Sequence, residues 1–204
     1  MQRPITTILL LGSFDHQTKA QLENVKEEIA KTFSGENVYA LLLDGVEVYF
    51  SDVVEVLTEL STENMVTLFI FKGNQLLDMD DLKLEETVDK TVYNYLKKEY
   101  NITEFKRLPI FDKLDTVMRN AKIIFLLRDK EETRGGEYLE LMHALFRGHA
   151  EKIWFLKKNS IALSLMLMEY LDKYKVKMRT YNEKSDLTTA VIRTLRYQLQ
   201  NSTT

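Results

Sequence analysis

The chain has 204 residues, of which 45% are hydrophobic and 29% are charged, and these proportions are typical of an ordinary globular protein. This length suits one compact domain with a substantial core, so we expect residues 1–204 to form a single domain. The 28 lysines and arginines and the 31 acidic residues leave a formal net charge of −3. Nothing therefore attracts the whole chain to nucleic acid or to an anionic membrane, and neither partner is expected.

Cysteine is absent, which excludes disulfides, thiolate nucleophiles and cysteine-based zinc sites. No apolar run approaches the roughly 18 residues that a membrane span needs, and the first residues lack the cleavage region of a signal peptide. A cytoplasmic protein is therefore expected. The three histidines, His16, His143 and His149, have no metal-ligand spacing, so no metal site is predicted. We expect His143 and His149 at a helix surface or near a helix C-terminus.

The first part of the chain predicts a strand, a helix and a second strand. Residues 5–11 are continuously apolar, which suits a strand that is buried on both faces of a parallel sheet. Gly12 ends this strand, and Asp15 or Thr18 can cap the helix that follows. That helix has one apolar stripe, made by Leu22, Val25, Ile29 and Phe33. Residues 38–43 then read as the next strand, so the unit is a strand–helix–strand motif.

The middle of the chain is less regular. Ser51 or Asp52 can cap a helix that extends to Leu60, because apolar residues recur there at helical spacing. Residues 65–71 are typical of a strand. Residues 74–108 are acidic first and then helical in pattern, and we interpret them as an insertion or a lid.

The second part of the chain alternates strands and helices again. The expected strands are residues 121–127, 152–156 and 175–181, and the expected helices begin near Pro109, Gly136, Ser160 and Ser185. The methionine-rich residues 161–168 are apolar almost all round, and we favour buried core over a subunit interface for them. A homodimer remains open, because the last strand and helix lie at an expected sheet edge.

This alternation predicts a three-layer α/β fold of the flavodoxin-like or Rossmann-like type, with a mostly parallel sheet of about five strands. In such a fold, ligands bind at the carboxyl ends of the strands, where helix N-termini offer unpaired N–H groups to anions. Gly135 and Gly136 mark one such helix start, shortly after the central strand. We therefore seek function at this place first.

Two carboxylates follow these glycines. Glu137 and Glu140 are three positions apart, which places them about 60° apart around a helix, so both can face one cleft. A carboxylate there can act as a nucleophile or a base, and the positive helix end would keep it ionised. The alternative is that acidic residues are simply favoured in a first helical turn. Arg134, in the preceding loop, can bind a phosphate bidentately or be a solvated loop arginine.

The segment from Gly136 to Ala144, GEYLELMHA, resembles the G-T-x-x-E-x-G-x-A segment of the nucleoside 2-deoxyribosyltransferase superfamily. The turn Leu11-Gly12-Ser13-Phe14 also resembles the opening strand and glycine turn of that family, which form part of its sugar or base pocket. Glu137 stands where the family has a small hydroxyl residue, and Met142 stands where it has its second glycine. The resemblance implies a sheet with the strand order 2-1-3-4-5.

The resemblance also implies a mechanism. Glu140 would attack C1′ of an N-glycosidic bond, because displacing a base through an oxocarbenium-like state needs a carboxylate close to the anomeric carbon. Asp129, at the end of the central strand, would contact the base or the leaving group. The residues expected to bind the ligand are Gly12, Ser13, Phe14, Arg134, Gly135, Gly136 and Glu137. No cofactor is expected.

Two functions of different class are thus predicted. One is an enzyme that binds a nucleoside or nucleotide and cleaves or transfers its N-glycosidic bond through Glu140. The other is a non-catalytic nucleotide-binding or protein-interaction module of the same fold. Glu140 and the glycine turn favour the enzyme, whereas the replaced threonine and glycine of the motif favour the module.

Overall fold

The computed structural model describes residues 6–13, 15–34, 36, 38–44, 47–50, 54–60, 65–72, 75–77, 110–131 and 135–201. In chain order the elements are β1 (Thr6–Gly12), α1 (His16–Thr32), β2 (Val38–Asp44), β3 (Glu47–Phe50), β4 (Val54–Leu60), β5 (Met65–Lys72), β6 (Gln75–Leu77), α5 (Ile110–Asn120), β7 (Ile123–Arg128), α6 (Gly136–Phe146), the 3-10 turn η1 (Ala150–Lys152), β8 (Ile153–Lys158), α7 (Leu165–Lys173), β9 (Lys177–Tyr181) and α8 (Lys184–Gln200). Among these helices, none combines the length and the apolar character needed to cross a bilayer.

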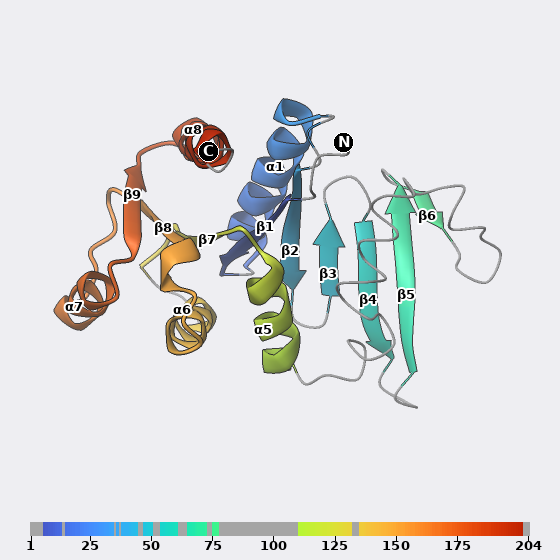
Figure 1. Cartoon of the computed structure of the whole chain (residues 1–204), viewed down its shortest axis with the longest axis horizontal. Coiled ribbons are helices and arrows are strands. Elements are labelled where there is room, and N and C mark those ends of the chain that lie inside the picture. Colours follow the sequence, from blue (N-terminus) through green and yellow to red (C-terminus); the bar gives the residue numbers. More distant parts are fainter. Residues whose placement is uncertain are drawn as a thin grey trace.

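The main sheet has six strands in the order β3-β2-β1-β7-β8-β9 (Figure 1). The five strands from β2 to β9 run parallel, and β3 pairs antiparallel with β2 at the edge. Without β3, the order is the expected 2-1-3-4-5, and the three-layer α/β fold is confirmed. The chain order reverses between β1 and β7, and this is the position at which ligands bind in open α/β sheets.

Successive side chains of each central strand pack into two separate hydrophobic cores, because the side chains of a strand point alternately to opposite faces of the sheet. In β1, Leu9 and Leu11 pack on one face, whereas Ile8 and Leu10 pack on the other. The β7 strand is buried along its whole length. This explains the continuous apolar sequence of both strands: each face of the sheet is covered, so neither strand needs a polar side.

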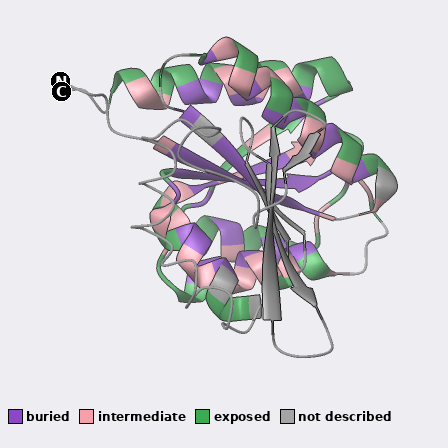
Figure 2. Cartoon of the chain, turned by 90° about the vertical axis from the view of Figure 1, so that its right-hand side faces the viewer, coloured by how far each residue is buried: buried purple, intermediate pink, exposed green. Residues whose placement is uncertain are grey.

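Helices cover both faces of the main sheet. The α1 and α8 helices pack on the face of Ile8 and Leu10, whereas α5, α6 and α7 pack on the face of Leu9 and Leu11. Figure 2 shows buried strands between these two layers of helices. Side chains at the carboxyl ends of the strands therefore have different neighbouring helices on the two faces of the sheet.

The helix expected up to Leu60 is wrong, because residues 54–60 form β4. This strand pairs antiparallel with β5 over its whole length, from Val54 opposite Phe71 to Leu60 opposite Met65. The strand expected at residues 65–71 is confirmed as β5, although it belongs to a separate three-stranded sheet in the order β4-β5-β6. Val54, Val56 and Thr58 stand at every second position of this sequence, and β-branched residues at that spacing favour a strand.

The interpretation of residues 74–108 as an insertion or lid falls mostly outside the described residues. Within it, residues 75–77 form β6, which pairs antiparallel with β5. The rest of the segment, including its helical pattern, is not among the residues that the structure describes.

The methionine-rich helix begins later than expected and is only partly buried. Ser164, not Ser160, is its N-cap, since the Ser164 hydroxyl accepts a hydrogen bond from the N–H of Leu167. Leu167 faces the core, but Met166 is 70% exposed. The expected core role is therefore wrong for the outer face of α7, which consists of Leu165, Met166 and Met168.

Candidate functional site

Two consecutive charged residues at the end of β7 lie on opposite faces of the sheet. The strand alternation that sends Leu126 to one core and Leu127 to the other continues past the end of the apolar run. Arg128 accordingly contacts Glu137 of α6, whereas Asp129 contacts Thr18 of α1. The carboxyl end of β7 thus carries two charged side chains that have different neighbours on the two faces of the sheet.

The neighbourhood of Arg128 is closed by internal contacts. Its guanidinium donates hydrogen bonds to the Glu137 carboxylate and, at 2.6 Å, to the carbonyl oxygen of Glu131. It also lies over the ring of Tyr138, 4.7 Å from the centroid. Both charged side chains of the pair are almost completely buried. Glu137 was expected to bind a ligand, but the structure places its carboxylate in this internal ion pair.

The glycines before Glu137 start α6 as expected. Gly135 is the N-cap and has φ of 82°, in the left-handed region that glycine enters without steric cost. Its carbonyl oxygen accepts hydrogen bonds from the N–H groups of Tyr138 and Leu139. Gly136 is the first helical residue and is exposed. The two glycines therefore explain the position at which the helix begins.

Glu140 lies one turn further along α6 and is partly buried. Its Oε2 atom has no hydrogen-bond partner among the described residues. Burial, together with the nearby negative charge of Glu137, raises the pKa of the Glu140 carboxyl to about 8. The expectation that the helix end keeps this carboxylate ionised is therefore wrong, because removal from water outweighs the helix dipole and leaves Glu140 protonated at neutral pH.

The neighbourhood of Asp129 begins with the cap of α1. Asp15 is the N-cap, and its carboxylate accepts from the N–H groups of Gln17 and Thr18 and, at 2.5 Å, from Lys130 Nζ. Burial alone would raise the pKa of Asp15, but the hydrogen bonds from Lys130 and Thr18 hold it well below its usual range. The Thr18 hydroxyl lies 2.7 Å from Asp129 Oδ1 and 2.8 Å from Asp15 Oδ2. Since Asp15 has other donors, the single Thr18 proton can serve Asp129.

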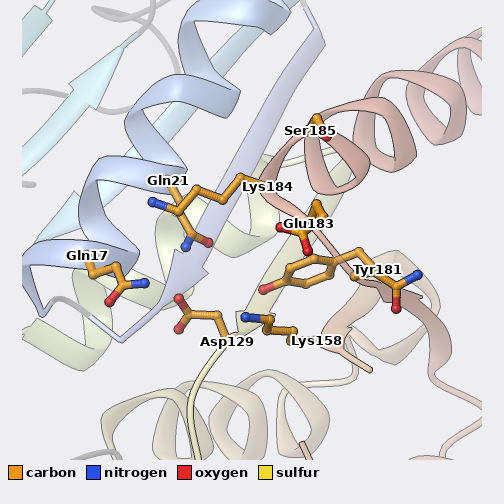
Figure 3. A pocket seen from close by; sticks show the side chains of 9 residues that line it. Gln17, Gln21, Asp129, Lys158, Tyr181, Glu183, Lys184 and Ser185 are labelled. Carbon is orange, nitrogen blue, oxygen red and sulfur yellow. The ribbon is translucent and has the colours of Figure 1, made fainter. Parts of the chain in front are cut away.

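A cavity of about 410 Å³ opens beside Asp129 (Figure 3). It lies at the carboxyl ends of β7, β8 and β9 and between the first turns of α1 and α8. Its floor is formed by the three buried side chains Gln21, Asp129 and Tyr181. Its rim is formed by Gln17, Lys158, Asn182, Glu183, Lys184 and Ser185. Every residue that lines the cavity therefore carries a polar group in its side chain.

The floor carries polar atoms that the described part of the protein leaves without partners. The Tyr181 hydroxyl and the Gln21 Oε1 atom are buried and make no hydrogen bond there. Tyr181 is 5% exposed, and burial raises the pKa of its hydroxyl, with a contribution from the charge of Asp129. The phenol is therefore neutral and can donate its proton. Leaving such a group unpaired costs about 1–3 kcal/mol, which a ligand in the cavity would recover.

The structure separates the residues that the sequence grouped together. Asp129 lines the cavity on the α1 and α8 face, whereas Glu140 belongs to α6 on the opposite face. Gly12 has a packing role, because a Cβ atom there would lie 3.1 Å from the carbonyl oxygen of Leu127. Ser13 follows Gly12 and is partly buried. Phe14 and Arg134 lie outside the described residues.

Of the residues that line the cavity, sequence reasoning selected Asp129 alone as a site residue, and Gln21, Lys158 and Tyr181 are among those it missed. A signal for two of them was present, since Lys158 and Tyr181 stand at the carboxyl ends of β8 and β9 as Asp129 does after β7. Polar residues that end parallel strands meet at one edge of a sheet. Gln21 had no comparable signal, because it lies inside an amphipathic helix.

The two histidines of the second half form a cluster with Asp115 of α5. The Nε2 atoms of His143 and His149 lie 3.9 Å and 3.7 Å from Asp115 Oδ1, and Arg147 Nε lies 3.6 Å from the same oxygen. His143 lies in the last turn of α6, near a helix C-terminus as expected, although both histidine side chains are mostly buried and not at a helix surface. The cluster joins α5 to the end of α6 on the face opposite the cavity.

No protein-family model matches the chain, and no curated protein matches it. The resemblance to the nucleoside 2-deoxyribosyltransferase superfamily therefore rests on the quoted residues alone.

Proposed function

We propose that the protein binds a nucleoside or nucleotide in the cavity between α1 and α8. The observation that carries this proposal is the buried, unpartnered Tyr181 hydroxyl, which faces the cavity together with Asp129 and Gln21 (Figure 3). Buried polar groups in proteins almost always have partners, so such an exception needs an explanation, and a polar ligand supplies one. The volume of about 410 Å³ also falls in the usual range of small-molecule sites.

The position of Glu140 favours a binding module over an enzyme with a glutamate nucleophile. A ligand on the floor of the cavity would contact Asp129, on the face of α1 and α8. Glu140 belongs to α6, on the other face, and is not among the residues that line the cavity. A protonated carboxyl is also a poor nucleophile at neutral pH.

Cleavage of an N-glycosidic bond remains the second candidate, and one observation favours it. The raised pKa of Glu140 makes this carboxyl an acid that can protonate a departing base near neutral pH. In this candidate function Glu140 acts as the general acid that protonates the departing base while a water molecule adds to C1′, whereas the family resemblance implies that Glu140 is the nucleophile.

The proposal includes a cytoplasmic location and a homodimer. Exposed apolar residues on α7, Leu165 and Met166, are compatible with a contact between two copies. Cell fractionation checks the location, and sedimentation velocity checks the oligomeric state, where a single monomeric species at high concentration would reject the dimer.

The experiment is a panel of nucleosides, nucleoside monophosphates and NAD, assayed in parallel for thermal stabilisation and for release of free base. A ligand at 100 times its Kd stabilises the folded state by about 2.7 kcal/mol, which is easily seen. We expect stabilisation of the wild type and a smaller stabilisation of Asp129→Asn. Base release that disappears in Glu140→Gln would select the second candidate. If no compound gave thermal stabilisation or base release, both candidates would be rejected.

A further inference from the structure

Resting on the proposed function, we propose that the cavity is specific for a ribonucleoside monophosphate, with the ribose hydroxyls on its floor and the phosphate at its rim. The floor is the set Gln21, Asp129 and Tyr181, and the charged rim is the pair Lys158 and Lys184.

The floor requires a ligand group that both donates and accepts hydrogen bonds. The Asp129 carboxylate and the Gln21 Oε1 atom are acceptors, whereas the neutral Tyr181 hydroxyl needs an acceptor for its proton. An amino group only donates, and a carbonyl only accepts, so either would leave one side of the floor unpaired. A hydroxyl does both, and the two neighbouring hydroxyls of a ribose offer two donors and two acceptors to these three side chains.

The floor also excludes the phosphate. Asp129 is buried and in contact with Thr18, and a second anion beside it would meet its charge in a place with little water to screen it. The phosphate must therefore lie away from Asp129, so the polar floor fixes the orientation of the ligand as well as its class.

The rim supplies the positive charge that a phosphate needs. Lys158 ends β8 and Lys184 is the first residue of α8, and both side chains are exposed and line the cavity. Among the described residues of the rim, the acidic one is Glu183, the N-cap of α8, whose carboxylate accepts the N–H of Asp186. The positive end of the α8 dipole adds to the attraction of the two lysines.

The experiment is isothermal titration of the full chain with AMP, 2′-deoxy-AMP and adenosine. We expect AMP to bind, 2′-deoxy-AMP to bind about tenfold more weakly because it lacks one hydroxyl, and adenosine to lose a similar factor because it lacks the phosphate. Asp129→Asn should abolish the preference for ribose. The double variant Lys158→Gln and Lys184→Gln should abolish the preference for the phosphate and keep the preference for ribose.

The matched control is Lys122→Gln, which removes an exposed lysine at the amino end of β7, on the edge of the sheet opposite the cavity. It should bind all three compounds as the wild type does. Melting curves of each variant show that the fold is intact.

Failure of this inference differs from failure of the proposed function. Equal affinity for AMP and 2′-deoxy-AMP, or a ribose preference that survives Asp129→Asn, would overturn the inference while nucleotide binding itself stands. Absence of heat with all three compounds, together with no stabilisation in the wider ligand panel, would overturn both.

Discussion

The carboxyl end of β7 carries two charged residues, one on the face of α6 and one on the face of α1, and their surroundings differ. Arg128 meets its opposite charge, a carbonyl oxygen and an aromatic ring inside the protein. Asp129, the next residue, meets one threonine hydroxyl and a cavity. The two side chains differ in their surroundings. Arg128 is surrounded by contacts within the protein, whereas a cavity lies beside Asp129.

The largest expected effect comes from breaking the buried ion pair of Arg128 with Glu137. Arg128→Ala leaves the Glu137 carboxylate buried without its main partner, and breaking a buried pair in this way costs about 3–5 kcal/mol. Urea denaturation measures this loss in the free energy of unfolding.

The control for this variant is Lys31→Ala, which breaks the exposed pair of Lys31 with Glu28. Exposed pairs contribute little to stability because solvent screens them, so this change should be small. Similar losses in both variants would show that the Arg128 pair is not a closed structural contact.

The second effect concerns pH, through Glu140. The folded-state pKa of about 8 lies above the usual glutamate value of 4.5, so the contribution of this carboxyl to stability is complete below pH 4.5 and is lost as the pH rises toward 8. Glu140→Gln removes this loss and should stabilise the protein at high pH relative to the wild type, by on the order of 2–4 kcal/mol. Unfolding curves across the pH range measure the difference, and parallel pH profiles for both proteins would reject the raised pKa.

The third effect tests the contact between β1 and β7, which lies next to Arg128 and Asp129 in the chain. Gly12→Ala would put a Cβ atom 3.1 Å from the Leu127 carbonyl oxygen and 3.3 Å from the Leu127 Cβ. Overpacking against backbone costs about 1–3 kcal/mol, because the two paired strands cannot move apart easily. Differential scanning calorimetry should show a lower Tm, and an unchanged Tm would mean that the strands adjust without strain.

The sequence predicted the main sheet better than the site. Unbroken apolar runs such as Ile123–Leu127 can be satisfied only by burial on both faces, so they specify central parallel strands directly. In residues 54–60, by contrast, apolar residues fit both a helical and an alternating pattern, and pairing with β5 decided the outcome.

The site was harder to predict because it depends on which face each side chain takes. Glu137 and Glu140 were correctly placed on one helix, yet the sequence did not reveal that Arg128 neutralises the first and that burial protonates the second. Asp129 was identified from its position after the central strand. Its neighbours Gln21 and Tyr181 come from positions more than 50 residues away on either side, and only the fold brings them together.

The most direct test of the central claim, that the floor of the cavity is built for a ligand, is a comparison of Tyr181→Phe with the wild type in two readouts. Because the Tyr181 hydroxyl is buried without a partner, its removal should stabilise the empty protein by about 1 kcal/mol in urea denaturation. The same variant should lose most of the stabilisation that AMP gives the wild type. A variant that is less stable than the wild type when empty, and that AMP stabilises just as well, would contradict the claim.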